Sequence, residues 1–238
     1  MKKVAAFIVF CLVLGSMSVS VAAEKPRVGV LRFTNDTTAG WWSYSVGRDL
    51  QDMLASELVS TKSFQVLERK EIDAVLGEQE LGKSGRIDKA TRAKMGKIKG
   101  AKYLVAGTVS AYEESTSGTG GGIGIGGFSI GGKQDKAYMA VDLKVIDTTT
   151  GEIVDARTVE ASSSSGGLSL GGGVGEFRGG LSKYQKTPTG KAIRACIIEI
   201  AEYLECSLTK GQDDSCMQDY KEKESKRKEK TKKSIELE

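Results

Sequence analysis

Two stretches of the sequence have the spacing of phosphate-binding loops. Gly122–Gly127 satisfies the G-x-G-x-x-G pattern of dinucleotide-binding proteins, and Gly127–Lys133 resembles the loop that holds nucleotide phosphates. Both chemistries require a helix directly after the loop, because the amides at its N-terminus bind the phosphate. A strand-like sequence follows instead, and Gln134 stands where a serine or threonine would hold magnesium. We therefore expect no nucleotide cofactor.

Catalytic and metal-binding chemistry is limited by the complete absence of histidine. Without histidine the chain cannot form Ser-His-Asp or Cys-His nucleophile pairs, nor a zinc site with histidine ligands. We expect no catalytic residue, no cofactor site and no metal site, and we predict that the protein is not an enzyme.

Three cysteines follow the N-terminal region. Cys196 lies on the apolar face of an expected helix, so we predict a buried thiol. Cys206 and Cys216 flank a polar loop and form a possible disulfide, provided that the chain enters an oxidising compartment. The odd number of cysteines leaves this pairing open.

The N-terminus has the features of an export signal. Lys2 and Lys3 precede eleven apolar residues at 4–14, and small residues at 21–23 precede Glu24. We expect cleavage after residue 23 and an exported mature chain. Apart from the two lysines, basic residues number 33 and acidic residues 31, a balance that argues against a nucleic-acid partner.

Two glycine-rich segments are the most unusual feature of the chain. Gly118–Gly132 contains nine glycines, and Gly166–Gly180 contains eight. Large apolar residues alternate within each segment, and the phase of the alternation shifts near the middle, which is typical of a hairpin turn. Each arm has about ten residues, the length of a strand that crosses a bilayer. The expected lipid-facing residues are Ile123, Ile125, Phe128, Ile130, Leu168, Leu170 and Val174.

The same composition is also typical of mobile surface loops. A glycine within a strand costs about 1 kcal/mol relative to alanine, so isolated hairpins of this kind are unstable. One chain offers four such strands, whereas closed membrane barrels begin at about eight. A barrel therefore requires several copies of the chain, and the residues alone leave barrel and loop open.

The remaining mature chain alternates between expected strands and helices, which predicts an α/β fold with a mixed sheet and flanking helices. Strands are expected at 27–33, 64–67, 103–112, 138–147 and 152–161. In the strand at 138–147, alternate residues Met139, Val141, Leu143 and Val145 lie on one face. Helices are expected from Val46 to Leu58, at 69–80, at 88–100 after an Asp88 cap, and from Pro188 past Leu204 after a Thr187 cap. Each has apolar residues on one side: Val46, Leu50, Met53, Leu54 and Leu58 in the first, Ile72, Val75 and Leu76 in the second, Met95 and Ile98 in the third, and Ile193, Cys196, Ile197, Ile200, Ala201 and Leu204 in the fourth. The mixed-charge run at 221–233 is typical of a solvated helix or tail.

With these elements placed, the chain resembles the CsgG family, the outer-membrane secretion channels for curli fibre subunits. The resemblance covers most of the mature chain. It is carried by Phe64–Lys70, Ala101–Glu113, Ala140–Val154 and the helix at 188–204, together with the spacing of the two insertions around the strand pair at 138–161.

This resemblance implies a small periplasmic domain, two hairpins per subunit in a shared transmembrane β-barrel, and a ring-shaped homo-oligomer. The family's narrowest pore point is a loop between the first strand and the first helix. That loop corresponds here to 35–45, so Trp41, Trp42 and Tyr44 become the candidate pore constriction. Such aromatic residues are more often core or capping residues, and this alternative stays open.

The implied function is passive export of unfolded polypeptide, either curli-type subunits or related chains, with accessory secretion proteins as partners. The implied location is the periplasm and outer membrane of a Gram-negative bacterium. The alternative function is a soluble periplasmic interaction protein on the same scaffold, with the glycine-rich segments as mobile loops.

The expected organisation along the chain follows from these assignments. It consists of a signal peptide (1–23), a first part of the α/β domain (24–113), a first hairpin (114–136), a strand pair (137–161), a second hairpin (162–186), a helix (187–210) and a charged tail (211–238).

Overall fold

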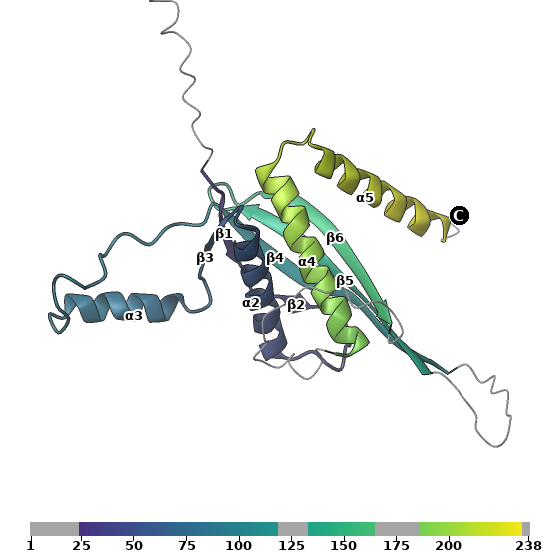
Figure 1. The fold of residues 1–238 in the computed structure, drawn as a ribbon, viewed down its shortest axis with the longest axis horizontal. Helices are drawn as coiled ribbons and strands as arrows, with labels where there is room; N and C mark the ends of the chain where they lie inside the picture. Colours follow the sequence, from purple (N-terminus) through teal and green to yellow (C-terminus); the bar gives the residue numbers. More distant parts are fainter. Residues whose placement is uncertain (1–23, 119–132, 165–185, 235–238) are drawn as a thin grey trace, which may run out of the picture.

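The strands form one mixed sheet in the order β3-β1-β4-β5-β6, with a short β2 paired to β4 (Figure 1). The structure is a computed structural model and describes residues 24–118, 133–164 and 186–234. The parallel strands are β1 (Arg27–Val30), β2 (Thr34–Asn35) and β3 (Gln65–Leu67). Two long antiparallel pairs join β4 (Tyr103–Gly118), β5 (Lys133–Asp147) and β6 (Ile153–Ser164).

Two of the four helices in the described residues pack against each other and against the strands (Figure 1). These are α2 (Tyr44–Thr61), which lies against β1 and β3, and α4 (Pro188–Thr209), which lies against β5 and β6. The other two, α3 (Ile72–Lys83) and α5 (Ser215–Lys233), lie outside this layer. The mixed α/β architecture expected from the sequence is therefore confirmed.

The core lies between the sheet and these two helices. The alternation predicted in β5 is confirmed, because Met139, Val141, Leu143 and Val145 are all buried. Residues at helical spacing on α2 and α4 close the other side of this core, as the apolar stripes predicted. They are Val46, Leu50, Leu54 and Leu58 on α2, and Ile193, Ile197, Ile200 and Leu204 on α4.

Phe33, which follows β1, packs closely against Gly107 of β4 and Gly47 of α2. A side-chain carbon at Gly107 would lie 2.3 Å from the Phe33 ring, and one at Gly47 would lie 2.4 Å from the Phe33 carbonyl oxygen. The Phe33 amide also donates to the Gly47 carbonyl oxygen at 3.1 Å. The helix α2 can therefore approach the first strands closely only because both positions lack a side chain.

The prediction of a helix at 88–100 is wrong. The Asp88 carboxylate accepts a hydrogen bond from the Ala90 amide, but only a single turn follows, and Gly96 adopts a positive φ of 71°. Met95 and Ile98, the apolar residues of the expected stripe, are half exposed and pack on no core. A short amphipathic segment without a packing surface lacks the contacts that stabilise a helix.

The three antiparallel strands are longer than the sequence predicted. The periodicity predicted that β4 ends at 112 and β6 at 161, whereas their backbone pairing continues to Gly118 and Ser164. It predicted that β5 begins at 138, whereas pairing begins at Lys133. Apart from Ala137 and Gly118, the additional residues are polar, so the apolar alternation that indicated the strands does not extend over them. Among the described helices, none combines the length and apolarity that a bilayer-spanning helix requires.

Candidate functional site

Both glycine-rich segments leave the sheet at the same end, which we call the root region. It comprises 112–118 of β4, 133–139 of β5, 162–164 of β6 and 187–190 of α4. Ser115 pairs with Lys136, and Lys136 pairs in turn with Ser164, so three neighbouring strands share one level of the sheet. The chain on both sides of the first segment and the chain that enters the second therefore start side by side (Figure 1).

The two ends of the first segment are held together by strand pairing. The antiparallel register of β4 and β5 continues without a break from Ala111 and Ala140 to the last pair, Gly118 and Lys133. Consecutive antiparallel strands in register are the two arms of a hairpin.

The described residues that flank 165–185 are also held close, by the start of α4. The Ser163 hydroxyl donates to the Pro188 carbonyl oxygen at 2.5 Å, and the buried Thr189 hydroxyl lies 2.8 Å from the Tyr112 hydroxyl. The Thr187 side chain accepts from the Gly190 amide at 3.1 Å and caps the helix, as the sequence predicted. The described chain on either side of residues 165–185 therefore lies at the root region.

The aromatic loop after β1 reaches the same end of the sheet. Strand β2 places the loop beside β4, because Asn35 pairs with Val109 and the Asp36 amide donates to the Val109 carbonyl oxygen at 3.0 Å. The Trp41 ring then meets the Tyr112 ring edge to face, with centroids 5.3 Å apart. The root region thus brings together three parts of the chain that the sequence analysis singled out separately.

The three candidate constriction residues have different surroundings. Trp41 is buried with only 8% of its surface exposed, so its ring is a core residue that a passing polypeptide cannot reach. Trp42 is half-buried and packs edge to face on Trp41 at 5.8 Å. Tyr44 is 69% exposed and lies under the Arg32 guanidinium at 4.2 Å. Burial of Trp41 restricts the predicted role to Trp42 and Tyr44.

The aromatic loop is held in one shape by its own polar side chains. The Asn35 amide group donates to the Thr37 carbonyl oxygen, and its oxygen accepts from the Thr37 amide and hydroxyl at 3.2 and 2.7 Å. The Thr37 hydroxyl accepts in turn from the Ala39 amide, and the Trp42 amide donates to the Ala39 carbonyl oxygen. These local turns fix the backbone that carries Trp41 and Trp42.

Tyr138 is a neutral group at the centre of the root region. Burial raises the pKa of its hydroxyl, and the carboxylates of Glu160 and Glu113 raise it further because they disfavour a phenolate. Glu113 is its register partner on β4. The tyrosine therefore stays protonated at any physiological pH.

The predicted lipid-facing residues lie outside the described residues. They are Ile123, Ile125, Phe128, Ile130, Leu168, Leu170 and Val174. Their assignment to a membrane-facing surface stays a prediction.

A second feature, far from the root region, is a groove between α4 and α5. A disulfide joins Cys206 to Cys216 with their Cα atoms 6.1 Å apart, and it ties the start of α5 to the end of α4. Arg157 lies against the rings of both Tyr203 and Tyr220 and so holds α5 over β6.

Cys196 is the buried thiol that the sequence predicted, and burial raises its pKa to about 12.

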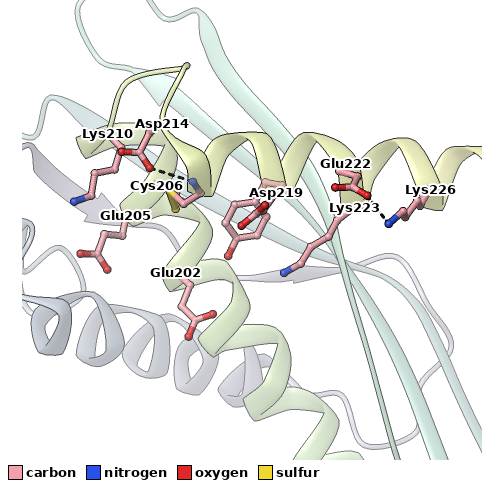
Figure 2. Close-up of a pocket in the computed structure, with 11 residues that line it drawn as sticks. Glu202, Glu205, Cys206, Lys210, Asp214, Asp219, Glu222, Lys223 and Lys226 are labelled. Carbon is pink, nitrogen blue, oxygen red and sulfur yellow. Dashed lines mark hydrogen bonds and ion pairs between the residues drawn. A yellow bond between two sulfur atoms is a disulfide. The ribbon is translucent and has the colours of Figure 1, made fainter.

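This groove, which we call the α4–α5 groove, encloses about 580 Å³ and has an acidic lining (Figure 2). Five carboxylates and three lysines line it, and Tyr220 and the disulfide form its apolar part. Two of the lysines already pair with carboxylates, Lys226 with Glu222 and Lys223 with Glu199. Within the described parts of the chain, no three potential metal ligands come close enough to hold an ion.

The sequence analysis missed the residues that close the root region. Tyr112 carried one signal, since it stands at the end of a predicted strand directly before a glycine-rich segment. Ser163 and Thr189 carried none, because their contacts join residues 25 and 77 positions apart in the chain.

Comparison with known proteins gives one match over nearly the whole chain. The family model described as "Curli production assembly/transport component CsgG" matches residues 13–235. The comparison with curated proteins gives no match.

Several solved structures share part of the fold at low sequence identity. The hypothetical protein CT253 from Chlamydia trachomatis is 14% identical, with 78% of this chain and 98% of that chain covered and a TM-score of 0.46. The PelC dodecamer from Paraburkholderia phytofirmans is 14% identical, with coverages of 73% and 84% and a TM-score of 0.35. Lipoprotein GNA1162 from Neisseria meningitidis is 16% identical, with coverages of 61% and 88% and a TM-score of 0.33.

Proposed function

The chain belongs to the CsgG family of curli production assembly/transport components, and on this premise we propose that it is an outer-membrane secretion pore. In this proposal a ring of identical protomers stands in the periplasm of a Gram-negative bacterium. Each protomer contributes two hairpins, one from each glycine-rich segment, to a shared β-barrel. Unfolded polypeptide, of curli type or related, leaves the cell through this barrel.

The observation that carries the proposal is the convergence at the root region. The described chain on either side of both segments lies there, and the pairing of Gly118 with Lys133 holds the two ends of the first segment together. The antiparallel order brings β4 and β6 to the same end of the sheet, since both run opposite to β5. Two hairpins of one wall need this arrangement, because neighbouring barrel strands need a common register.

The glycine content also fits a wall that forms only between protomers. Hairpins with so many glycines are unstable alone, and the four strands of one protomer fall short of a closed barrel. Closure by neighbouring copies would satisfy every backbone group in the bilayer. Assembly and membrane insertion are then one event, and a single protomer has no pore.

The aromatic loop supplies the constriction in this proposal. Trp42 and Tyr44 stand at the entrance to the barrel, where flat rings can stack on an extended chain and a folded domain cannot pass. Transport needs no catalysis and no nucleotide, because diffusion moves an unfolded chain through an open pore. Substrates and accessory secretion proteins would approach from the periplasmic side.

Fractionation and conductance together test the proposal. The protein should remain with outer membranes after osmotic shock, and detergent-extracted rings should give stepwise ion conductance in planar bilayers. Release by osmotic shock as a monomer, without conductance, would instead identify an exported interaction protein of the periplasm.

The constriction has its own pair of variants. Trp42→Ala should raise single-channel conductance, because it removes a ring from the narrowest point. Trp41→Ala serves as the matched control, since a buried ring affects stability rather than the opening. Equal conductance of Trp42→Ala and the unmodified chain would move the constriction elsewhere.

A further inference from the structure

The helix α3 and the segment that follows it form an arm without a partner inside the protomer. The arm, residues 72–100, projects from the side of the molecule opposite the α4–α5 groove (Figure 1). Helix α3 has only 12 residues, and none of them belongs to the hydrophobic core, so the helix is marginal on its own. Its predicted apolar side is open to solvent, with Val75 40% and Leu76 45% exposed.

The rest of the arm repeats this pattern. The chain folds back only as far as Gly82, which lies against Arg92 and Ala93, and residues 91–100 are exposed throughout. Met95 and Ile98 add two more exposed apolar side chains, 50% and 40% exposed. An arm with this much uncovered apolar surface is typical of a segment that binds another protein.

The charge of the arm indicates what the partner presents. Between 84 and 100 the arm carries one carboxylate, Asp88, and six cations at Arg86, Lys89, Arg92, Lys94, Lys97 and Lys99. Helix α3 adds three carboxylates and one lysine, so the whole arm has seven cations against four carboxylates and stays basic. A partner surface must therefore combine an apolar floor with negative charge around it.

The α4–α5 groove of the same chain has this combination. Tyr220 and the Cys206–Cys216 disulfide provide its apolar part, and carboxylates outnumber lysines along its walls. Glu202 and Asp219 form no ion pair with any described residue, so their charges face the opening without a neutralising partner (Figure 2).

We propose that the arm of one protomer docks into the α4–α5 groove of the next copy of this chain. The proposal rests on the ring assembly of the proposed function and names its contact. Because the two surfaces lie on opposite sides of one protomer, the contact is head to tail, and head-to-tail contacts close into a ring when the rotation from copy to copy completes a circle. The disulfide then has a role in assembly, since it holds α5 as one wall of the groove.

Cysteine cross-linking of membrane-extracted, full-length mature protein tests the contact. A chain carrying both Leu76→Cys and Glu202→Cys should give, on mild oxidation, a ladder of covalent oligomers up to the size of the ring. Chains with only one of the two changes should stop at dimers. The native Cys196 is buried, and the other two native cysteines are already paired, so they do not interfere.

A charge substitution gives an independent readout. Leu76→Asp should weaken assembly at least tenfold in the concentration at which rings dissociate, measured by light scattering after size exclusion. Ile153→Asp is the matched control, because Ile153 is also exposed, at 56%, but lies on β6 outside both surfaces. Circular dichroism checks that both variants keep the fold.

The outcomes separate this contact from the pore itself. Conducting rings that give no ladder, and that tolerate Leu76→Asp as well as Ile153→Asp, would overturn the proposed contact and leave the secretion pore standing. A wild-type protein that is monomeric in membrane extracts and shows no conductance would overturn both.

Discussion

Helices α3 and α4 have the same kind of sequence pattern, but α3 is mostly exposed and α4 is mostly buried. Each has apolar residues at helical spacing, and each was predicted as a helix with one apolar side. In α4 the residues of this stripe are almost fully buried, with Ile200 and Leu204 at 0% exposure, whereas Val75 and Leu76 of α3 are among the exposed apolar residues. Periodicity predicts the helix and its apolar side, but it does not say whether the partner lies in the same protomer.

The difference also separates two kinds of stability. The contacts of α4 hold one protomer together, because it packs on β5, β6 and α2. The arm adds little to the protomer and, in the proposed ring, much to assembly. Substitutions on the two helices should therefore affect different measurements.

The largest expected effect comes from truncating α4. Leu204→Ala should lower the free energy of unfolding by about 2–5 kcal/mol, because it removes fully buried methyl groups and leaves a cavity. Leu76→Ala on α3 should change it by less than about 0.5 kcal/mol. Urea unfolding of dissociated protomers measures both. Similar losses for the two variants would show that α3 packs within the protomer after all.

The next effect concerns α5, which the disulfide joins to α4. Replacing both Cys206 and Cys216 by serine should cost about 2–3 kcal/mol, since the unfolded chain regains the freedom of a closed loop. The same urea titration measures the loss, and chemical reduction of the unmodified chain should reproduce it. In the proposed ring contact α5 forms one wall of the groove, so the same double substitution should also weaken ring assembly. An unchanged midpoint would mean that the Tyr203–Arg157–Tyr220 cluster alone fixes α5.

Alkaline pH probes the α4 interface through Cys196. Its folded pKa of about 12 lies above the ordinary value near 9, so the unfolded chain loses the thiol proton first. The contribution of this thiol to stability is complete below pH 9 and is lost as pH rises toward 12. By pH 10 the loss should be about 1.4 kcal/mol. Cys196→Ala should flatten this part of the profile, and an identical profile for the variant would contradict the assignment.

The smallest expected effect is at the start of α4. Thr187→Ala removes the side-chain oxygen that caps the helix beside the root region and should cost about 1 kcal/mol. Thr187→Ser keeps that oxygen and should retain most of the stability. Thermal unfolding of the two variants side by side measures the difference. Equal losses would show that the capping bond contributes nothing.

The sequence predicted the parts of the fold whose patterns are local. The alternation of Met139, Val141, Leu143 and Val145 and the stripe from Ile193 to Leu204 both pack as their periods indicated. A Thr-Pro pair marked the start of α4 correctly, and the Cys206–Cys216 spacing allowed the disulfide that is present. Each of these signals lies within a few turns of one element.

The parts that escaped prediction depend on distant residues. The expected helix at 88–100 has an amphipathic pattern but no surface to pack on, so the period alone misled. Trp41 had the composition of a pore-lining residue, and only the approach of Tyr112 from β4 shows that it belongs to the core. The hydrogen bonds of Ser163 and Thr189 at the root region join three elements, and no local sequence pattern indicates them.

Hydrogen exchange in native outer membranes tests the central claim most directly. The account predicts that amides in 118–132 and 166–180 exchange as slowly as those of β5, because each would be paired within a closed wall. Protection should disappear when detergent separates the protomers. Fast exchange of both segments in the intact envelope, with β5 still protected, would contradict the secretion pore.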